Sequence, residues 1–553
     1  MLTGSRAWHG PMGTALRRPV IAATALAAFL HVIWALFLAR NAGDLAAQYA
    51  WTDFTRQNPY SIYNLSWYGG MHTATYSVLS PYLMGWLGVR TTGVLVGTAS
   101  AALAALLLER SRLSRPMLPA LWTTLTLWSD IASGRVTFAI GLALGLAATV
   151  LLFPQAPRRT ARTAAAAVLA TLATLCSPVA GLFLGVVAAA LFLSGRRSEG
   201  CVLVTGPVLV VAGTSLLFPF SGVQPFDWYV AVPLAAAAVL LALLVPAQWR
   251  VLRYGAAVYA LGVVLAFVVP SPIGSNVERL PLLFGATVPL AIALNRSSRP
   301  VAAMLRTAPR LRGRALALGA AFLALATWQV VAPVGDLIST VPTPPTPLRA
   351  GPVIDELRKV GADRGRVEVV PLRSHWESSA IAPYVDLARG WNRQADVARN
   401  PLFYNDTPLT ADSYHRWLQR WGVGYVLLPP DQPDDAAVEE ARIVAAGNPW
   451  LEPVWRSDNW QLFRVTDATP LADPPATVTL ATPAELTVQV AQPGRVLIRV
   501  PWSPWLSIEG DKGSTAGCLA DADGWTALYA PAPATYRLTG RFSLTPGNPC
   551  PQT

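Results

Sequence analysis

Long apolar runs alternate with short polar connections over roughly the first 335 residues. The runs lie near residues 20–38, 91–108, 117–131, 134–153, 164–176, 178–193, 202–218, 228–246, 251–270, 280–294 and 315–333. A membrane-spanning helix needs about 20 mostly apolar residues. The pattern therefore predicts a polytopic α-helical membrane protein with about 11 transmembrane helices. The first run is long for a signal-peptide core, so we interpret it as a retained anchor.

Two of the runs, 164–176 and 178–193, are short for a membrane span. They are read either as a tight hairpin around Ser177–Pro178 or as a single broken helix. The placement of arginines favours the hairpin, because a single span would invert the alternation of basic loops that follows.

Arginine clusters separate alternate pairs of apolar runs, as expected for cytoplasmic loops. The arginines assigned to the inner side, besides Arg17 and Arg18 before the first run, are Arg110, Arg112, Arg115, Arg158, Arg159, Arg162, Arg196, Arg197, Arg250, Arg253, Arg296, Arg299, Arg306, Arg310, Arg312 and Arg314. The opposite loops hold Asp44, Asp53, Asp130, Asp227 and Glu278. We therefore predict a multi-pass plasma-membrane protein with a cytoplasmic N-terminus and an extracytoplasmic C-terminal domain.

After residue 336 the pattern of apolar and polar residues changes. Residues 1–336 are assigned to the transmembrane domain, with a long first outer loop at 41–90, and residues 337–352 form a linker rich in Pro and Thr. Residues 353–470 mix helical periodicity, as in 353–360 and 411–421, with short strands at 366–370 and 424–428. From 471 to 553, alternating runs such as RVLIRV and WTALYA predict a small β-sandwich.

Charge divides the chain in the same place. Up to residue 336 there are 24 basic and 8 acidic residues, whereas 19 basic and 23 acidic residues follow. The overall charge of +12 is thus a property of the membrane part and follows its loops, which argues against a nucleic-acid partner. The excess of Arg over Lys, with abundant Ala and Pro, indicates a GC-rich bacterial genome.

Cys518 and Cys550 lie in the predicted extracytoplasmic part, where an oxidising compartment permits a disulfide between them. Two unpaired thiols are the alternative. Cys176 and Cys201 lie in apolar runs and are interpreted as packing residues.

The first outer loop contains the highest density of candidate functional residues. Asp44 follows the first apolar run, and Asp53, Trp67, Tyr68 and His72 come after it. Aromatic residues at this density suit either an interfacial belt or a sugar-stacking cleft. Residues 76–87 have the composition of a short amphipathic helix on the outer leaflet.

Two further polar clusters are predicted on the same side of the membrane. Asp130 and Arg135 lie between the third and fourth runs, and Asn276, Glu278 and Arg279 precede the tenth. Acids and arginines at a membrane edge are functional candidates, and a guanidinium suits a phosphate because it donates two parallel hydrogen bonds. A structural ion pair is the alternative for each cluster.

This arrangement resembles the GT-C glycosyltransferases. The resemblance rests on an acid, Asp44, just past the first helix, a long first outer loop, about 11 passes and an outer C-terminal domain. Many GT-C enzymes carry a second acid beside the first, but Leu45 and Ala46 follow Asp44 here. The resemblance therefore assigns no certain cofactor and leaves a divalent cation, and any metal ligands, open.

The resemblance implies an enzyme that moves a sugar from a polyprenyl-phosphate donor in the bilayer to an envelope glycan or lipid acceptor. Asp44 then corresponds to the catalytic base, and Arg279 and Arg135 to the groups that bind the donor phosphate. Around them, Asp53, Trp67, Tyr68, His72, Asp130, Asn276 and Glu278 make up the implied substrate pocket.

Two other classes of function share this topology. A secondary transporter would place acids in mid-span and show internal repeats, neither of which the sequence contains. A non-catalytic scaffold for envelope assembly needs only the membrane anchor and the outer domain. The sequence also lacks GxxxxGK[ST], HExxH and CxxC motifs, which argues against ATP-driven transport and a zinc site of those types.

Overall fold

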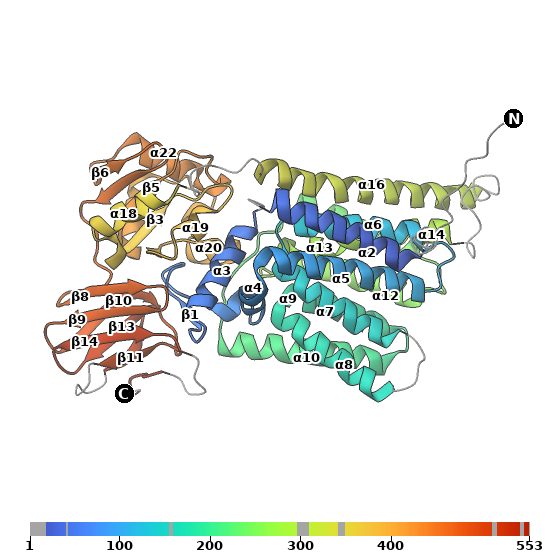
Figure 1. The fold of residues 1–553 in the computed structure, drawn as a ribbon, viewed down its shortest axis with the longest axis horizontal. Helices are drawn as coiled ribbons and strands as arrows, with labels where there is room; N and C mark the ends of the chain where they lie inside the picture. Colours follow the sequence, from blue (N-terminus) through green and yellow to red (C-terminus); the bar gives the residue numbers. More distant parts are fainter. Residues whose placement is uncertain are drawn as a thin grey trace. The chain divides into compact units, whose positions relative to one another are not determined.

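The computed structural model describes residues 18–39, 43–153, 159–295, 309–340, 349–510, 517–541 and 547–551 (Figure 1). The chain divides into two units. Unit 1 comprises Met1–Ala42, Leu87–Pro219 and Val223–Val341, and unit 2 comprises Gly43–Trp86, Phe220–Gly222 and Pro342–Thr553. Outside the described residues lie residues 341–348, which are half of the expected linker, and Arg17, Arg158, Arg296, Arg299 and Arg306.

Unit 1 is helical wherever the sequence predicted an apolar run. Its helices are α2 (Pro19–Ile33), continued by the π-helix η1 (Trp34–Leu38), α5 (Val89–Arg110), α6 (Met117–Ala132), α7 (Val136–Leu152), α8 (Arg159–Cys176), α9 (Pro178–Leu193), α10 (Arg197–Leu217), α11 (Trp228–Leu244), α12 (Arg250–Val268), η3 (Gly274–Glu278), α13 (Arg279–Phe284), α14 (Thr287–Leu294) and α16 (Pro309–Thr340). Ser177 caps α9 and Pro178 begins it, so 164–193 is a helical hairpin.

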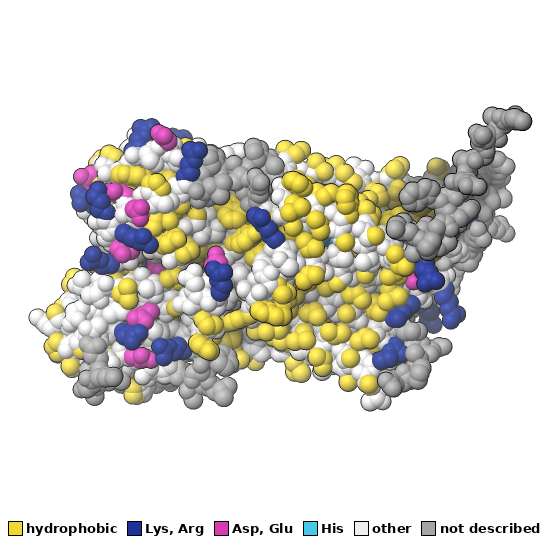
Figure 2. Space-filling model, viewed as in Figure 1, with side chains coloured by type: hydrophobic (Ala, Val, Ile, Leu, Met, Phe, Trp, Pro, Cys, Tyr) yellow, Lys and Arg dark blue, Asp and Glu magenta, His cyan; other side chains and the backbone are white. Residues whose placement is uncertain are grey.

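Six helices within the described part of the chain are long and apolar enough to cross a membrane. They are Pro19–Leu38, Val89–Arg110, Arg197–Leu217, Arg250–Val268, Gly274–Leu294 and Gly313–Ile338. Four shorter apolar helices accompany them, at Val136–Leu152, Thr160–Cys176, Pro178–Leu193 and Trp228–Leu244. Figure 2 shows a broad hydrophobic surface over the middle of this unit, as expected where lipid replaces water. The chain is a polytopic helical membrane protein.

Small residues bring α2 and α5 together. A Cβ at Gly93 would lie 2.7 Å from the ring of Trp34, and one at Gly97 would lie 2.1 Å from Nε2 of His31. Both aromatic side chains are fully buried. Glycines four residues apart therefore form the groove that admits two large side chains, a common packing solution between membrane helices.

One end of unit 1 is rich in arginine, and we call it the basic end. Arg110 and Arg196 donate hydrogen bonds to the carbonyls of Val150 and Leu152 at the C-terminus of α7, over 2.9 and 3.0 Å. Arg314 likewise donates to the carbonyl of Leu244 at the end of α11 over 2.8 Å. The Val150 carbonyl also accepts a hydrogen bond from Phe153 N at 3.3 Å. The arginines complement the negative ends of the helix dipoles.

Unit 2 contains a five-stranded sheet in the order β4-β3-β5-β7-β6. Its elements are α18 (Gly351–Lys359), η4 (Ala362–Arg364), β3 (Arg366–Val369), α19 (Glu377–Ala380), β4 (Asp386–Leu387), α20 (Arg393–Arg399), η5 (Pro401–Phe403), α21 (Ala411–Trp421), β5 (Val423–Leu428), η6 (Asp435–Ala437), α22 (Val438–Ala446), β6 (Leu451–Arg456) and β7 (Gln461–Val465). Strands β4, β3 and β5 are parallel, whereas β7 and β6 are antiparallel. The helix predicted at 411–421 buries Trp417, Leu418 and Trp421, as its periodicity requires.

The C-terminal part of unit 2 consists of two small antiparallel sheets, as the alternating runs predicted. Their strands are β8 (Ala476–Thr482), β9 (Glu485–Val490), β10 (Gly494–Pro501), β11 (Ser507–Gly510), β12 (Cys518–Ala522), β13 (Trp525–Ala530) and β14 (Ala534–Thr539). The sheet orders are β10-β13-β12 and β11-β14-β9-β8. The buried residues of both sheets form one shared hydrophobic core. A disulfide joins Cys518 to Cys550.

The first outer loop is an integral part of unit 2 and not an appendage of the membrane helices. It contains α3 (Leu45–Gln57), β1 (Tyr63–Asn64), β2 (Met71–His72), η2 (Thr73–Thr75) and α4 (Ser80–Leu87). Its backbone bonds to segments far along the chain: Ile62 N donates to Gly540 O, Leu65 N to Pro483 O, and Leu387 N to Ser66 O. The sequence assigned residues 41–90 to the transmembrane domain, whereas the hydrogen bonds of Gly43–Trp86 tie this segment to the C-terminal domain.

Candidate functional site

Asp44 lies at the N-cap position of α3, six residues after the last residue of η1. Its backbone carbonyl accepts from Gln48 N at 3.4 Å. The carbonyl of the preceding residue, Gly43, accepts a hydrogen bond from the indole Nε1 of Trp391 at 3.0 Å. A carboxylate at a helix N-terminus is stabilised by the helix dipole. Asp44 therefore stands at the start of a helix that is tied to the α/β part of unit 2.

A polar cluster lies at the end of unit 1 where acids gather, which we call the acidic end. Arg135 Nη1 lies 3.8 Å from Asp130 Oδ1, and its Nη2 lies 3.5 Å from Asp336 Oδ2. Ser133 donates to the same oxygen of Asp336 over 2.8 Å. Asp130 is 5% exposed, so burial makes its charge costly unless it is compensated. Arg135 supplies part of that compensation from the start of α7.

The predicted cluster around Arg279 belongs to the same acidic end. The carboxylate of Glu278 interacts electrostatically with the guanidinium groups of both Arg135 and Arg279, and with the carboxylate of Asp227. The guanidinium carbon of Arg279 lies 5.3 Å from the centroid of the Phe138 ring. Asn276 is buried nearby in η3. The two arginines, from α7 and α13, therefore share one electrostatic neighbourhood, which the sequence had left as two separate clusters.

Trp67, Tyr68 and His72 lie inside unit 2 and are 1%, 0% and 8% exposed. Trp67 Nε1 donates to Ser378 O at 3.2 Å. Tyr68 Oη donates to Gly390 O at 2.9 Å. His72 Nε2 lies 3.0 Å from Ser503 Oγ, and burial is the main cause that lowers the pKa of His72 to about 4. These three side chains join the first loop to the C-terminal domain.

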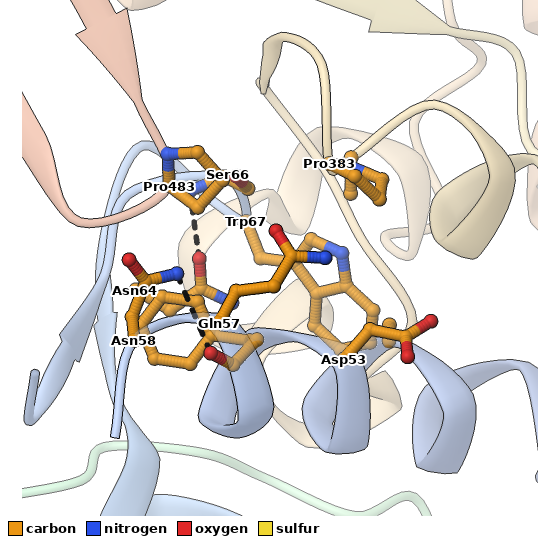
Figure 3. A pocket seen from close by; sticks show the side chains of 11 residues that line it. Asp53, Gln57, Asn58, Asn64, Ser66, Trp67, Pro383 and Pro483 are labelled. Carbon is orange, nitrogen blue, oxygen red and sulfur yellow. Dashed lines mark hydrogen bonds between the residues drawn. The ribbon is translucent and has the colours of Figure 1, made fainter.

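Asp53 and Trp67 line one hollow of unit 2, shown in Figure 3. The residues around it are Ala50, Asp53, Phe54, Gln57, Asn58, Asn64, Ser66, Trp67, Ala382, Pro383 and Pro483. Asp53 lies 3.8 Å from Arg56, and burial raises the pKa of its carboxyl group although Arg56 opposes the shift. Amide, hydroxyl and carboxylate groups beside an indole are the types of group that bind sugar hydroxyls and sugar faces.

A second buried polar cluster in unit 2 was not singled out from the sequence. His375, Trp391 and Asp434 come from the loops that follow β3, β4 and β5, respectively. The sequence did contain a signal, because each of these short strands is followed by a polar loop, and loops at the carboxyl ends of parallel strands converge. Strand β4 has only two residues, too few to be recognised from an alternating pattern.

Within the described residues, no group of three or more His, Cys, Asp or Glu side chains is arranged to hold a metal ion. At the acidic end two arginines, Arg135 and Arg279, lie among the carboxylates of Asp130, Asp227, Glu278 and Asp336. Asp44, in unit 2, and the arginines, in unit 1, lie in separate units.

Residues 473–553 match a family described as Domain of unknown function (DUF8823). No curated protein matches the chain. Among solved structures, the arabinofuranosyltransferase AftD from Mycobacteria is similar, with a TM-score of 0.47 and 14% identity over 95% of this chain and 57% of that one. A mutant of AftD gives a TM-score of 0.47 and 13% identity over 95% of this chain and 60% of that one. The chain thus spans less than two thirds of the length of either structure.

Proposed function

We propose that the chain is a membrane glycosyltransferase of the GT-C type. In this proposal it moves a sugar from a polyprenyl-phosphate donor to an envelope glycan or lipid acceptor on the extracytoplasmic face. The observation that carries the proposal is the shared neighbourhood of Arg135 and Arg279 at the acidic end of the membrane helices. Two guanidinium groups from different helices can bind a phosphate from two directions, and each can do so through two hydrogen bonds.

The proposed reaction is a displacement at the anomeric carbon. The acceptor hydroxyl oxygen forms a bond to that carbon while its proton passes to the carboxylate of Asp44. The bond between the anomeric carbon and the phosphate oxygen breaks, and the polyprenyl phosphate leaves with the electron pair. Arg279 and Arg135 stabilise the charge that develops on this leaving group. No step of this reaction requires a cofactor. The proposal leaves open whether a divalent cation takes part.

In this proposal Arg135 binds the phosphate beside its carboxylate neighbours Asp130, Asp336 and Glu278. Its contacts with Asp130 and Asp336 are 3.8 and 3.5 Å long, whereas charge-assisted N–H···O bonds are about 2.7–2.9 Å long. A guanidinium has five N–H donors, so a phosphate oxygen at the shorter distance would compete well for them. In this proposal Asp130, Glu278 and Asn276 hold the arginines, and Asp53, Trp67, Tyr68 and His72 shape the acceptor side.

The proposal is tested with the purified full chain in nanodiscs and a panel of short-prenyl phosphoryl sugars as donors. Release of prenyl phosphate in the presence of envelope glycan measures transfer. Asp44→Asn should reduce turnover by about 10²- to 10⁴-fold, the usual contribution of a general base. Arg279→Gln should reduce it by about 10²- to 10³-fold, the usual cost of removing one donor to a developing charge.

The matched control for Asp44→Asn is Asp355→Asn, which alters an exposed carboxylate of α18 that pairs with Arg358 at 3.6 Å. This variant should transfer sugar at the rate of the unmodified chain. Undiminished turnover by Asp44→Asn would remove Asp44 from the mechanism. Absence of transfer by the unmodified chain with every donor would reject the enzymatic proposal.

The orientation is part of the proposal, because the donor phosphate and the acceptor must meet outside the cytoplasm. In a Cys201→Ala background, which removes the exposed free thiol, Asp412→Cys places a new thiol on an exposed position of α21. An impermeant maleimide should label this thiol in intact cells. Labelling that occurs only after the cells are broken would contradict the orientation.

A non-catalytic scaffold is the second candidate, favoured by the burial of Trp67, Tyr68 and His72. Their bonds to the C-terminal part serve the packing of unit 2, as a scaffold would require. In that case Asp44→Asn and Arg279→Gln would leave envelope assembly in cells unchanged, whereas deletion of unit 2 would abolish it.

A further inference from the structure

Three loops of unit 2 meet beside the start of α3. They follow the parallel strands β3, β4 and β5, and they contribute His375, Trp391 and Asp434. The carboxyl ends of parallel strands are where such folds place their functional side chains. The mechanism proposed above uses none of these three residues.

His375 is held tightly within this loop cluster. Its ring stacks on Trp391 with the centroids 3.4 Å apart and the planes at 10°. Its Nε2 lies 3.3 Å from Asp434 Oδ2, and its Nδ1 lies 3.8 Å from Glu377 Oε1. The backbone of His375 has φ of +55°, a left-handed conformation that costs a non-glycine residue energy. Strain of this kind persists only where the surroundings enforce it.

The charges around His375 favour its protonated form. Asp434 and Glu377 face the imidazole, and the guanidinium of Arg393 binds Asp434 through two hydrogen bonds of 2.7 and 3.1 Å. Burial lowers the pKa of His375, but its contacts with Asp434 and Glu377 raise it more, so the pKa stands above its ordinary value. The protonated ring then stacks as a cation on the indole of Trp391.

Trp391 links the loop cluster to the start of α3. Its ring is fixed between His375 and Arg393, whose guanidinium carbon lies 5.3 Å from the ring centroid. Its Nε1 donates to the carbonyl of Gly43 over 3.0 Å. Gly43 directly precedes Asp44, so this hydrogen bond fixes the peptide plane from which Asp44 and the first turn of α3 begin.

We propose that Trp391, held in place by His375, is a positioning residue that fixes the orientation of Asp44 through the Gly43 carbonyl. This proposal rests on the role given to Asp44 in the proposed transferase. It assigns the loop cluster a function in the reaction although none of its side chains touches the substrate. When His375 loses its proton at rising pH, the stacking weakens and Asp44 becomes less well oriented.

Trp391→Phe is the decisive variant, because it keeps an aromatic ring on His375 and removes only the indole N–H. Mispositioning acts on the reacting geometry more than on substrate affinity. We therefore expect kcat for prenyl phosphate release to fall about tenfold, equivalent to about 1.4 kcal/mol, while KM changes less than twofold. The backbone amides in the first two turns of α3 should exchange with deuterium faster than in the unmodified chain.

The matched control is Trp376→Phe in the neighbouring loop. Its indole Nε1 is buried without a hydrogen-bond partner, and its ring pairs with Tyr49 at 5.5 Å. This variant removes an indole N–H from the same loop cluster without removing a bond to Gly43. It should keep the kcat and the exchange rates of the unmodified chain.

His375→Gln tests the second half of the proposal. The unmodified chain should lose kcat on the alkaline side as His375 deprotonates, and this limb should be absent from the profile of His375→Gln, whose kcat should be low throughout. Equal kcat and equal exchange rates for Trp391→Phe and the unmodified chain would overturn the proposal. If the unmodified chain transfers no sugar, the proposed function fails, and the exchange rates of α3 alone then decide whether Trp391 positions it.

Discussion

The Nε2 atom of His72 and the Oγ atom of Ser503 lie 3.0 Å apart, although 431 positions separate the two residues in the sequence. This contact joins the first outer loop to the segment between β10 and β11. Tyr63, also in the first loop, adds a bond from its hydroxyl to Pro501 O at 2.8 Å. The loop and the C-terminal domain therefore fold as one body. A substitution in the loop should change the stability of unit 2.

Acid should destabilise unit 2 through His72. Burial foremost, and the charge of Arg399 next, lower the pKa of His72 to about 4 in the folded protein. The unfolded chain takes up a proton near pH 6.5, so stability is complete above that pH and is lost as the pH falls from about 6.5 to about 4. The total loss from this residue is about 3 kcal/mol.

His72→Gln should reduce this acid-induced loss, because glutamine does not titrate. Thermal unfolding followed by tryptophan fluorescence between pH 7 and pH 4.5 measures the effect. His415→Gln serves as control, since His415 lies near the surface and pairs with Asp467 at 2.8 Å. An equally steep fall in the unfolding temperature of His72→Gln would show that other groups cause the acid sensitivity.

Asp386 should have the opposite effect on the pH dependence. Asp386 is 1% exposed, and neither carboxyl oxygen has a hydrogen-bond partner among the residues that the structure describes. Burial raises its pKa to about 7, against the attraction of Arg366. The unfolded chain releases this proton near pH 4, so stability is complete below about pH 4 and declines until about pH 7. The decline amounts to at most about 4 kcal/mol.

Asp386→Asn should therefore be more stable than the unmodified chain at pH 8. At pH 5 this gain in stability should be smaller or absent. Urea unfolding of unit 2 in the full chain, measured at both pH values, gives the two differences. A variant that is destabilised equally at both values would mean that the attraction between Asp386 and Arg366 outweighs the cost of burying the charge.

The sequence predicted those parts of the fold that depend on local periodicity. Every predicted apolar run became helical, and the alternating runs RVLIRV and WTALYA became β10 and β13. These elements could be predicted because the spacing of apolar residues reports which face is buried. Helix α16 continues to Thr340, beyond the apolar run expected to end at residue 333, and it contains Pro333.

The association of residues 43–86 with residues 342–553 could not be predicted in this way. It depends on pairings such as Ile62 N with Gly540 O, which no short-range pattern encodes. The aromatic density of Trp67, Tyr68 and His72 fitted a sugar cleft or an interfacial belt, yet in the structure it fills the core between segments. Asp44 and Arg279 as reacting groups stay predictions, since their roles rest on chemistry and not on packing.

The disulfide between Cys518 and Cys550 should contribute much to the stability of the C-terminal sheets. It closes a loop between residues 32 positions apart, and the entropy of the open chain that it removes corresponds to about 3–4 kcal/mol. Cys518→Ser and Cys550→Ser should each lower the free energy of unfolding by this amount, and reductant should do the same to the unmodified chain. Cys201→Ser, at an exposed free cysteine, should change nothing. Insensitivity to reductant would contradict a stabilising role.

Gly70 should tolerate no side chain, because the first loop passes close to Tyr63 at that point. A Cβ there would lie 2.3 Å from Cε1 and 2.8 Å from Oη of Tyr63, and φ of Gly70 is +137°. Tyr63 is 2% exposed and its hydroxyl is bound to Pro501, so the ring cannot move aside. Gly70→Ala should therefore cost about 3 kcal/mol or more, from overpacking together with backbone strain.

Gly361→Ala separates these two causes. Gly361 has φ of +73°, but no atom lies within 4 Å of the position that its Cβ would take. Strain alone should cost about 1–2 kcal/mol there, measured by the same urea unfolding. If both variants lose the same stability, the contact with Tyr63 yields easily, and the first loop is less firmly built into unit 2 than its hydrogen bonds indicate. A clearly larger loss for Gly70→Ala is the result expected when the loop is part of the core, since a core relaxes only partly around an added methyl group.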